Sequence, residues 1–177
     1  MPQGSYGDKG ILRVFLVGFM CSGKTTVGRI LAEKTGWELL DIDSEIERRE
    51  GMSIPLIFEK KGEDYFRDLE LKVLKEVAER KRIIVATGGG LGSNSEAMDL
   101  MKSKGYVVWI EVSFEEFMRR CSGSGERPLL RLGERVLREL MEKRSEVYSR
   151  AHLRVSGERE PEKVAEDILI NLSGYLS

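Results

Sequence analysis

A glycine-rich loop with a lysine stands out near the start of the chain. Residues 18–25, GFMCSGKT, fit the spacing G-x-x-x-x-G-K-[ST], and the apolar run ILRVFLV at 11–17 comes directly before them. In this spacing the backbone N–H groups of the loop surround nucleotide phosphates, and the lysine reaches the β- and γ-phosphates. A helix after the loop adds the partial positive charge of its N-terminus. The segment therefore predicts a site for a nucleoside triphosphate with Mg²⁺.

The individual residues of this loop have expected roles. We expect Lys24 to bind the phosphates as a catalytic group and the Thr25 hydroxyl to hold Mg²⁺. The nucleotide contacts that the motif predicts are Gly18, Cys21, Ser22, Gly23, Lys24, Thr25 and Thr26. Cys21 and Cys121 have no metal-binding spacing, so we expect both to be free, reduced thiols.

Two aspartates follow the second apolar run. The segment LLDID ends with Asp41 and Asp43 two residues apart. Side chains at i and i+2 of a strand point to the same side, so both carboxylates would face one site. Either could instead cap the helix expected to begin at Ser44. We interpret Asp43 as the group that accepts a hydrogen bond from a substrate hydroxyl, and Asp41 as a group near Mg²⁺, acting through water.

The segment IFEKKGEDYFRDLE combines aromatic and charged residues. Phe58 and Phe66 accompany Arg67, while Glu63 and Glu70 lie four residues before and three after the arginine. These spacings place the carboxylates next to Arg67 on a helix. From spacing alone, an amphipathic helix with surface ion pairs is the slightly favoured interpretation.

Two glycine-rich segments occur further along the chain. TGGG places Gly88, Gly89 and Gly90 after the run RIIVA, and three consecutive glycines permit the backbone to approach a ligand closely. The segment CSGSGERPLLRLGE at 121–134 holds three glycines and two serines between helical patterns. Its composition predicts a mobile lid.

Together these segments resemble one known family. The combination of GFMCSGKTT, DID, IFEKKGEDYFRDLE, TGGG, ERPLL and KRSEVYSR, in this order, is similar to the shikimate kinases from about Ile11 to Ile170. The resemblance implies transfer of the γ-phosphoryl group of ATP to the 3-hydroxyl of shikimate, in the route to chorismate and the aromatic amino acids. It also implies a P-loop fold of the nucleoside-monophosphate-kinase type, with a five-stranded parallel sheet in the order 2-3-1-4-5.

The resemblance also implies roles for individual residues. Asp43 would bind the ring hydroxyls, Arg67 and Arg144 the carboxylate, and Glu70 would hold Arg67 in place. Arg127 would be a catalytic lid arginine that closes over the phosphates. The other implied contacts with shikimate are Phe58, Phe66, Gly88, Gly89 and Gly90. Arg120 and Pro161 would flank the adenine, with Arg119 as an adjacent alternative to Arg120.

The elements that must position these residues follow from the hydrophobic pattern. Short apolar runs alternate with helical patterns, which predicts an α/β fold of three layers, α/β/α, around a parallel sheet. The predicted strands are 11–17, 37–42, 82–87, 106–112 and 152–156. The predicted helices are 25–36, 45–50, 53–61, 63–80, 94–103, 114–121, 133–149 and 161–174, with Ser53, Ser93, Ser113 and Pro161 near their starts.

Length and charge limit the remaining choices. The chain has 177 residues and a net charge of −1, which fits a single domain at 11–177 after a flexible tail at 1–10, with the substrate-binding segment at about 41–70. Charges of both signs without a basic excess argue against nucleic acid as a partner. No apolar run has the length of a membrane span and no signal peptide is recognisable, so we expect a cytoplasmic monomer without membrane contact.

Two alternatives remain open at this point. One is another P-loop kinase of small molecules, for example of the gluconate type or a nucleotide kinase, since the loop is common to many kinases. The other is a nucleotide-dependent switch that binds a protein partner. The absence of an Asn-Lys-x-Asp segment and the presence of the lid and TGGG segments argue against the switch.

Overall fold

The computed structural model of the chain describes residues 10–121 and 132–173. The predicted lid arginine, Arg127, lies outside the described residues, as do residues 122–131 of the predicted lid and residues 1–9 of the predicted tail. The roles expected for these segments therefore stay predictions.

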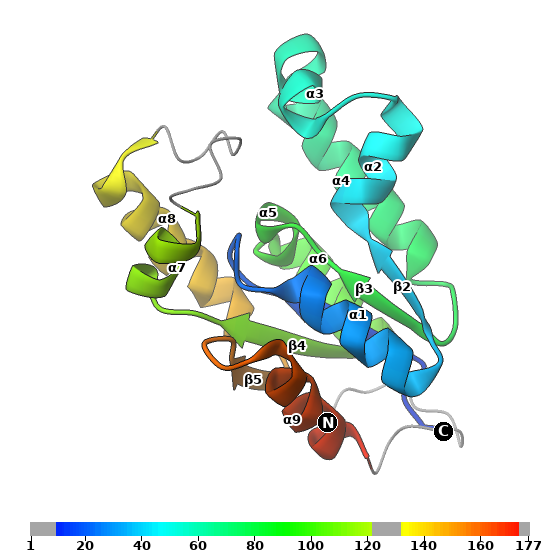
Figure 1. The fold of residues 1–177 in the computed structure, drawn as a ribbon. Coiled ribbons are helices and arrows are strands. Elements are labelled where there is room, and N and C mark those ends of the chain that lie inside the picture. The colour runs from blue at the N-terminus through cyan, green and yellow to red at the C-terminus, as the bar shows by residue number, and fades with distance from the viewer. Residues whose placement is uncertain (1–9, 122–131, 174–177) are drawn as a thin grey trace.

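A parallel sheet forms the centre of the molecule (Figure 1). Within the described residues it has five strands in the order β2-β3-β1-β4-β5, as the resemblance implied. The strands are β1 (Arg13–Val17), β2 (Glu38–Asp41), β3 (Ile83–Ala86), β4 (Tyr106–Glu111) and β5 (Leu153–Ser156). Each lies inside its predicted range, and every pairing is parallel. The central strands β1, β3 and β4 are buried on both faces, and such strands read as continuous apolar runs in the sequence.

The two faces of the sheet are covered by different helices, because successive side chains of a strand point to opposite faces. Val14 and Leu16 of β1 belong to a core shared with α1 (Lys24–Thr35) and α9 (Pro161–Leu172). Phe15 and Val17 belong to a second core, on the side of α4 (Glu63–Val77), α6 (Ser95–Lys104) and α8 (Glu134–Tyr148). The three-layer arrangement that the sequence predicts is therefore confirmed.

The remaining helices lie near the carboxyl ends of the strands. They are α2 (Ile42–Glu50), α3 (Ile54–Lys61), α5 (Gly89–Gly92) and α7 (Phe114–Cys121). Figure 1 shows α3 beyond the sheet, packed with α2 against α4. The starts expected near Ser53 and Pro161 are confirmed, since Ser53 caps α3 and Pro161 opens α9. The short helix α5 was not predicted, because a run of glycines carries no helical signal.

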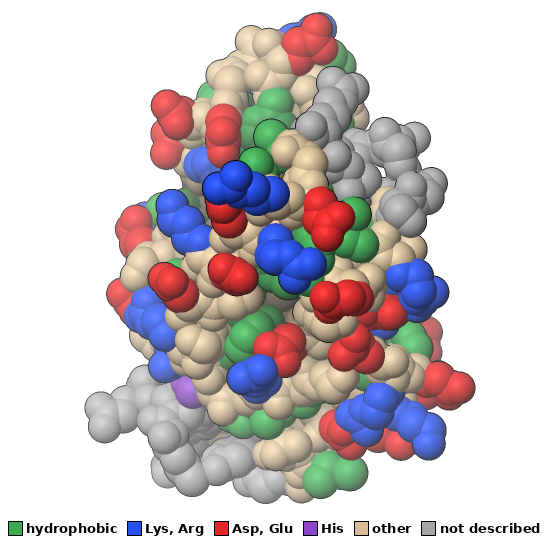
Figure 2. Space-filling view, turned by 90° about the vertical axis from the view of Figure 1, so that its left-hand side faces the viewer, with side chains coloured by type: hydrophobic (Ala, Val, Ile, Leu, Met, Phe, Trp, Pro, Cys, Tyr) green, Lys and Arg blue, Asp and Glu red, His purple; other side chains and the backbone are tan. Residues whose placement is uncertain are grey.

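The surface carries charges of both signs. Figure 2 shows acidic and basic side chains interspersed on the face drawn there. This matches a chain in which 33% of the residues are charged but the net charge is only −1. Among the described residues no helix combines the length and the apolar character that crossing a bilayer requires.

A buried arginine at the start of β1 binds the C-terminal ends of two helices. Arg13 of β1 is only 9% exposed, and it donates from Nε to the carbonyl of Arg80 at 2.6 Å and from Nη1 to the carbonyl of Lys104 at 3.1 Å. A third hydrogen bond reaches the carbonyl of Glu79. These carbonyls follow α4 and end α6, where helix dipoles favour a cation. The arginine thus satisfies helix ends that a neutral side chain would leave unpaired.

We expect Arg13→Met to lower the free energy of unfolding by about 2–4 kcal/mol, because it removes charged hydrogen bonds from buried carbonyls. Urea denaturation followed by circular dichroism measures the change. Arg48→Met is the matched control, since Arg48 forms an exposed ion pair with Glu45 and its loss should barely alter unfolding. Equal midpoints for Arg13→Met and the wild type would contradict this role.

Candidate active site

The glycine-rich loop joins the end of β1 to the start of α1, as predicted. Gly18 has φ +154°, and a Cβ at this residue would come within 2.5 Å of the Ile110 carbonyl oxygen of β4. A side chain is thus excluded here both by backbone conformation and by the neighbouring strand. Gly23, with φ +96°, precedes α1, and no side chain caps the first N–H groups of this helix. Such uncapped N–H groups form a binding site for an anion.

Lys24, the first residue of α1, folds back over the loop. Its Nζ donates to the carbonyl oxygens of Gly18 at 2.6 Å and Phe19 at 2.9 Å, and the residue is only 9% exposed. These bonds hold the ammonium group next to the loop backbone, beside the uncapped start of the helix. The charge is therefore placed where the sequence motif requires it.

Thr25 and Asp41 come together beside the loop. The Thr25 hydroxyl donates to Oδ2 of Asp41 at 2.6 Å, while Oδ1 of Asp41 accepts from the Ser44 backbone N–H at 3.0 Å. Asp41 thus caps α2, which the sequence left open, and also contacts the residue that was expected to hold Mg²⁺. A hydroxyl and a carboxylate in contact are oxygen ligands of the kind that Mg²⁺ prefers, together with water and phosphate oxygens.

Asp43 does not lie on a strand, so the argument that it shares a strand face with Asp41 is wrong. Strand β2 ends at Asp41 and α2 begins at Ile42, because the Asp41 side chain caps the helix there. Asp43 lies in the first turn of α2 instead. Its carboxylate nevertheless reaches the candidate site, because a Cβ on Gly88 would come 2.9 Å from its Oδ1.

The glycine run after β3 lies among charged side chains from several helices. A Cβ on Gly88 would also come 3.2 Å from Oε1 of Glu70, and a Cβ on Gly90 would collide with the Arg67 guanidinium. The absence of side chains here lets these groups pack against the backbone. The groups that approach the glycine backbone closely are thus the protein's own charged side chains. These side chains line the same cleft as the three glycines.

Arg67 lies at the centre of an interaction network on α4. Its Nη1 donates to Oε2 of Glu70 at 2.8 Å, and its Nε lies 3.5 Å from Oε1 of Glu63. The Arg67 guanidinium also lies 5.4 Å from the centroid of the Phe66 ring, and Phe58 meets Phe66 edge to face at 4.9 Å. The interpretation as surface ion pairs is wrong for Glu70, which is only 1% exposed. Because Glu70 is buried, the pair holds the Arg67 guanidinium in place and is not a solvated surface contact.

The charges around Arg67 alter several pKa values. Burial raises the pKa of the Glu70 carboxyl to about 7, although Arg67 acts in the opposite direction. Burial lowers the pKa of Arg67, but the carboxylates of Glu70 and Glu63 outweigh it and leave the value above its ordinary range. Burial also lowers the pKa of Arg144, and the charge of Arg67 contributes to this. Both arginines remain cationic at neutral pH.

Tyr148 is a site residue that the sequence reasoning missed. It is fully buried, and its hydroxyl donates to the Gly89 carbonyl oxygen at 2.6 Å. The hydroxyl also interacts with Arg144, one helical turn earlier on α8, and Nη1 of Arg144 would lie 3.1 Å from a Cβ on Gly89. The spacing of four residues between Arg144 and Tyr148 was the signal that could have identified it. Tyr148 therefore connects Arg144 to the glycine run.

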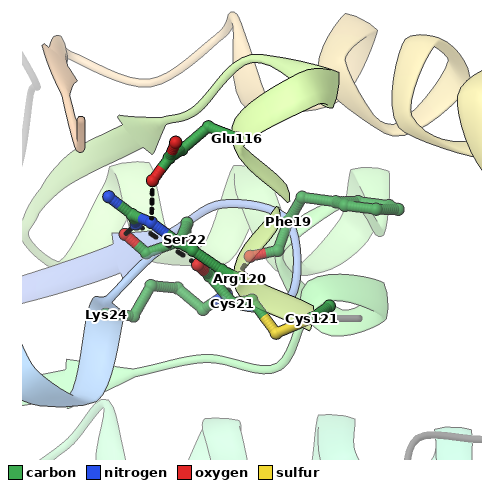
Figure 3. Close-up of a disulfide and its surroundings, with 7 residues drawn as sticks. All are labelled: Phe19, Cys21, Ser22, Lys24, Glu116, Arg120 and Cys121. Carbon is green, nitrogen blue, oxygen red and sulfur yellow. Dashed lines mark hydrogen bonds and ion pairs between the residues drawn. A yellow bond between two sulfur atoms is a disulfide. The ribbon is translucent and has the colours of Figure 1, made fainter. Parts of the chain in front are cut away.

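Arg120 of α7 binds the glycine-rich loop (Figure 3). Its Nη2 donates to the Gly157 carbonyl oxygen at 2.6 Å, and its Nε contacts Glu116 at 2.8 Å. Arg120 and Pro161 line the same cleft, whereas the side chain of Arg119 is 72% exposed and pairs with Glu116. The structure thus favours Arg120 over Arg119 as the residue near a nucleotide base.

The two cysteines are joined, so the expectation of free thiols is wrong. Cys21 of the loop and Cys121 at the end of α7 form a disulfide, with 6.1 Å between their Cα atoms (Figure 3). The separation of 100 residues gave no sequence signal. Packing of α7 against the loop brings the two residues together.

One cleft at the carboxyl ends of the strands unites these groups. It contains every predicted site residue that the structure describes except Gly18, which shapes the loop without lining the cleft. The cleft volume is about 1230 Å³. A single small-molecule site spans roughly 300–1000 Å³, so this cleft is large enough for two ligands. One end holds the glycine-rich loop, and the other holds Asp43, Arg67 and Arg144.

The raised pKa of Glu70 makes stability depend on pH. The folded protein binds a proton at Glu70 more tightly than the unfolded chain does, so this contribution is complete below the ordinary glutamate pKa and is lost as the pH rises through about 7. Glu70→Gln cannot titrate. We therefore expect its stability relative to the wild type to increase between about pH 5 and about pH 8, by about 1.4 kcal/mol for each unit of pKa shift.

Urea denaturation of both proteins across this pH window measures the effect. Glu63→Gln is the control, because it removes an exposed carboxylate from the same arginine and should keep the wild-type pH dependence. Parallel stability curves for Glu70→Gln and the wild type would show that Glu70 does not titrate in this window.

Comparison with known proteins gives a consistent result. The family model described as shikimate kinase matches residues 20–173. The chain is 49% identical to the shikimate kinase of Aquifex aeolicus over 163 residues, which are 92% of this chain and 97% of that protein. The crystal structure of shikimate kinase from A. aeolicus matches with a TM-score of 0.86, covering 92% of this chain and 97% of that one.

A second solved structure carries a ligand. Shikimate kinase from Acinetobacter baumannii, in complex with shikimate, is 40% identical and matches with a TM-score of 0.87, covering 94% of this chain and 96% of that one. The family model and these relatives each span most of the chain. The chain belongs to the shikimate kinase family.

Proposed function

We propose that this protein transfers the γ-phosphoryl group of ATP to the 3-hydroxyl of shikimate. The observation that carries the proposal is the meeting of Asp43, Arg67 and Arg144 at the glycine run after β3, in the same cleft as the phosphate-binding loop. Two cations and a carboxylate around a small pocket suit an acceptor that has one carboxylate and several hydroxyls. Membership of the shikimate kinase family identifies that acceptor as shikimate.

The acceptor end of the cleft supplies binding and orientation. Arg67 and Arg144 bind the carboxylate, since guanidinium groups form paired hydrogen bonds with a planar carboxylate. Phe58 and Phe66 form an apolar side of the pocket beside Arg67. Asp43 accepts a hydrogen bond from the acceptor hydroxyl and so fixes its direction of attack. Glu70 holds Arg67 in place, and Tyr148 holds Arg144.

The loop end supplies the phosphate site. The N–H groups at the start of α1 and the ammonium group of Lys24 bind the phosphates, and Arg120 with Pro161 lies where the adenine is expected. Thr25 and Asp41 are the oxygen ligands suited to Mg²⁺, which would neutralise phosphate charge when bound. The expected monomer stays a prediction, supported by the fact that one chain supplies the described walls of the cleft.

The reaction itself depends on placement. The acceptor oxygen forms a bond to the γ-phosphorus, the bond from that phosphorus to the β,γ-bridging oxygen breaks, and ADP leaves. The hydroxyl proton departs toward the Asp43 carboxylate. Such transfers depend mainly on in-line positioning and on charge stabilisation, which the two ends of the cleft provide.

The deciding experiment measures ADP release from Mg-ATP by the purified protein with different acceptors. Shikimate, gluconate, a nucleoside monophosphate and no acceptor are compared, and mass spectrometry identifies the product. We expect strong stimulation by shikimate alone, with phosphorylated shikimate as product. Stimulation only by another acceptor, or by none, would overturn the proposal.

Asp43→Asn tests the role of the carboxylate. We expect kcat to fall by about 100-fold or more, because the group that orients the hydroxyl and receives its proton is neutralised. The affinity for ATP should stay unchanged, since Asp43 lies at the acceptor end. Steady-state kinetics and titration calorimetry measure the two quantities. Loss of ATP affinity in parallel with turnover would count against this assignment.

Tyr148→Phe tests the positioning role of the buried hydroxyl. It removes the hydrogen bond to Gly89 and the contact with Arg144, and a loss of about 1 kcal/mol in acceptor binding should raise the KM for shikimate about fivefold and leave the KM for ATP unchanged. Tyr106→Phe is the matched control, because Tyr106 stacks on His152 away from the cleft. Equal changes in both KM values would indicate a general structural effect instead.

A further inference from the structure

The disulfide links the phosphate-binding loop to a helix that is distant in sequence. Cys21 lies in the loop and Cys121 is the last residue of α7. Figure 3 shows the bridge beside Arg120 and close to Lys24. The chain has two cysteines in total, so the bridge involves every thiol in the protein. No step of the proposed reaction uses it.

The same turn of α7 holds the loop in a second way. Nη1 of Arg120 donates to the carbonyl oxygens of Cys21 at 3.3 Å and Ser22 at 3.4 Å. Adjacent residues of one helix thus provide a covalent bond and two hydrogen bonds to adjacent residues of the loop. Arg120 is itself held by Glu116 and by the Gly157 carbonyl. The end of α7 therefore acts as a clamp on this part of the loop.

The backbone of the clamped loop has an energetically unfavourable conformation at Cys21. Cys21 has φ +60°, in the left-handed region, which is unfavourable for a residue with a Cβ. Contacts from outside the loop must maintain this conformation. The disulfide is the one covalent contact among them. Breaking it releases the loop toward other backbone conformations, while the weaker bonds from Arg120 remain.

The two cysteines differ in accessibility. Cys21 is partly exposed and lines the cleft, whereas Cys121 is fully buried. A thiolate that enters the cleft therefore meets Cys21 first. Phosphates bound at the loop would occupy the approach to it.

We propose that Cys21 and Cys121 form a redox site that takes a dithiol reductant and sets the affinity of the loop for ATP. The thiolate of the dithiol attacks Sγ of Cys21, and Cys121 leaves as a thiolate. The second thiol then resolves the mixed disulfide. Two electrons and two protons pass to the protein, which gains two thiols, and the dithiol becomes a disulfide. The oxidised protein is the form that binds ATP more tightly.

The size of the effect follows from the fraction of molecules whose loop is ready to bind. If reduction leaves the binding conformation populated in about one tenth of the molecules, the apparent Kd for ATP rises about tenfold. Linkage requires the reverse effect to be equal, so saturating ATP must make the disulfide harder to reduce by the same factor. The proposal rests on ATP binding at the loop, as argued above.

The experiment compares the full-length protein before and after treatment with dithiothreitol, with thiol titration to count the cysteines in each state. Calorimetric titration with Mg-ATP should give a Kd about tenfold higher for the reduced protein, while binding of shikimate stays unchanged. Cys121→Ala keeps the loop sequence but lacks the bridge. It should bind ATP like the reduced wild type and should not respond to dithiothreitol. Redox titration with and without ATP then tests the reciprocal shift.

Several outcomes would overturn the proposal. These are equal ATP affinity in the oxidised and reduced proteins, two titratable thiols after air oxidation, a response of Cys121→Ala to dithiothreitol, and parallel loss of shikimate binding on reduction. If the oxidised protein binds shikimate but no ATP, the proposed nucleotide site is wrong, and so is the redox proposal. Turnover with an acceptor other than shikimate would overturn the proposed function but not the redox site.

Discussion

The parallel pairing of β1 with β3 is the constraint on which the cleft depends. In this pairing Leu16 lies opposite Ala86, so both strands end at the same edge of the sheet. The phosphate-binding loop leaves β1 there, and the glycine run leaves β3 beside it. The sheet also has its switch point between these two strands, because the connection after β1 leads to one side, to β2, and the connection after β3 leads to the other, to β4; α/β sheets bind ligands at such points. The two ends of the cleft are therefore neighbours because two strands are neighbours.

The acceptor end then has to accommodate two cations in a partly buried space. Arg67 and Arg144 disfavour each other's charge, and each is held by a different buried group, Glu70 for Arg67 and Tyr148 for Arg144. The charged form of Glu70 is disfavoured in this arrangement, because burial of the carboxyl raises its pKa. Two arginines beside a carboxyl that is partly protonated near neutral pH suit an anionic ligand. The carboxylate binding that we propose for it would thus be a property of the whole network and not of one residue.

Much of this architecture could be predicted from the sequence, because buried parallel strands and the glycine-lysine loop have strong local signals. The strand order and the roles of Arg67, Arg144 and Arg120 came with the family resemblance, which local patterns alone could not supply. Asp43 does lie in the cleft, but the reason given for it, a shared strand face with Asp41, is wrong. The strand ends at Asp41, which caps α2. Glu70, Tyr148 and the disulfide depend on tertiary packing. Sequence spacing cannot show that Glu70 is buried or that Cys121 meets Cys21.

The protonation state of Glu70 has a further consequence for ligand binding. With a pKa of about 7, this carboxyl is partly protonated near neutral pH. A bound anion would add negative charge beside it and compete for Arg67, and both changes would favour the protonated form. Binding of the acceptor would then take up part of a proton from the solution, so the measured heat of binding would vary with the ionisation enthalpy of the buffer. The acceptor pocket thereby couples ligand affinity to proton activity.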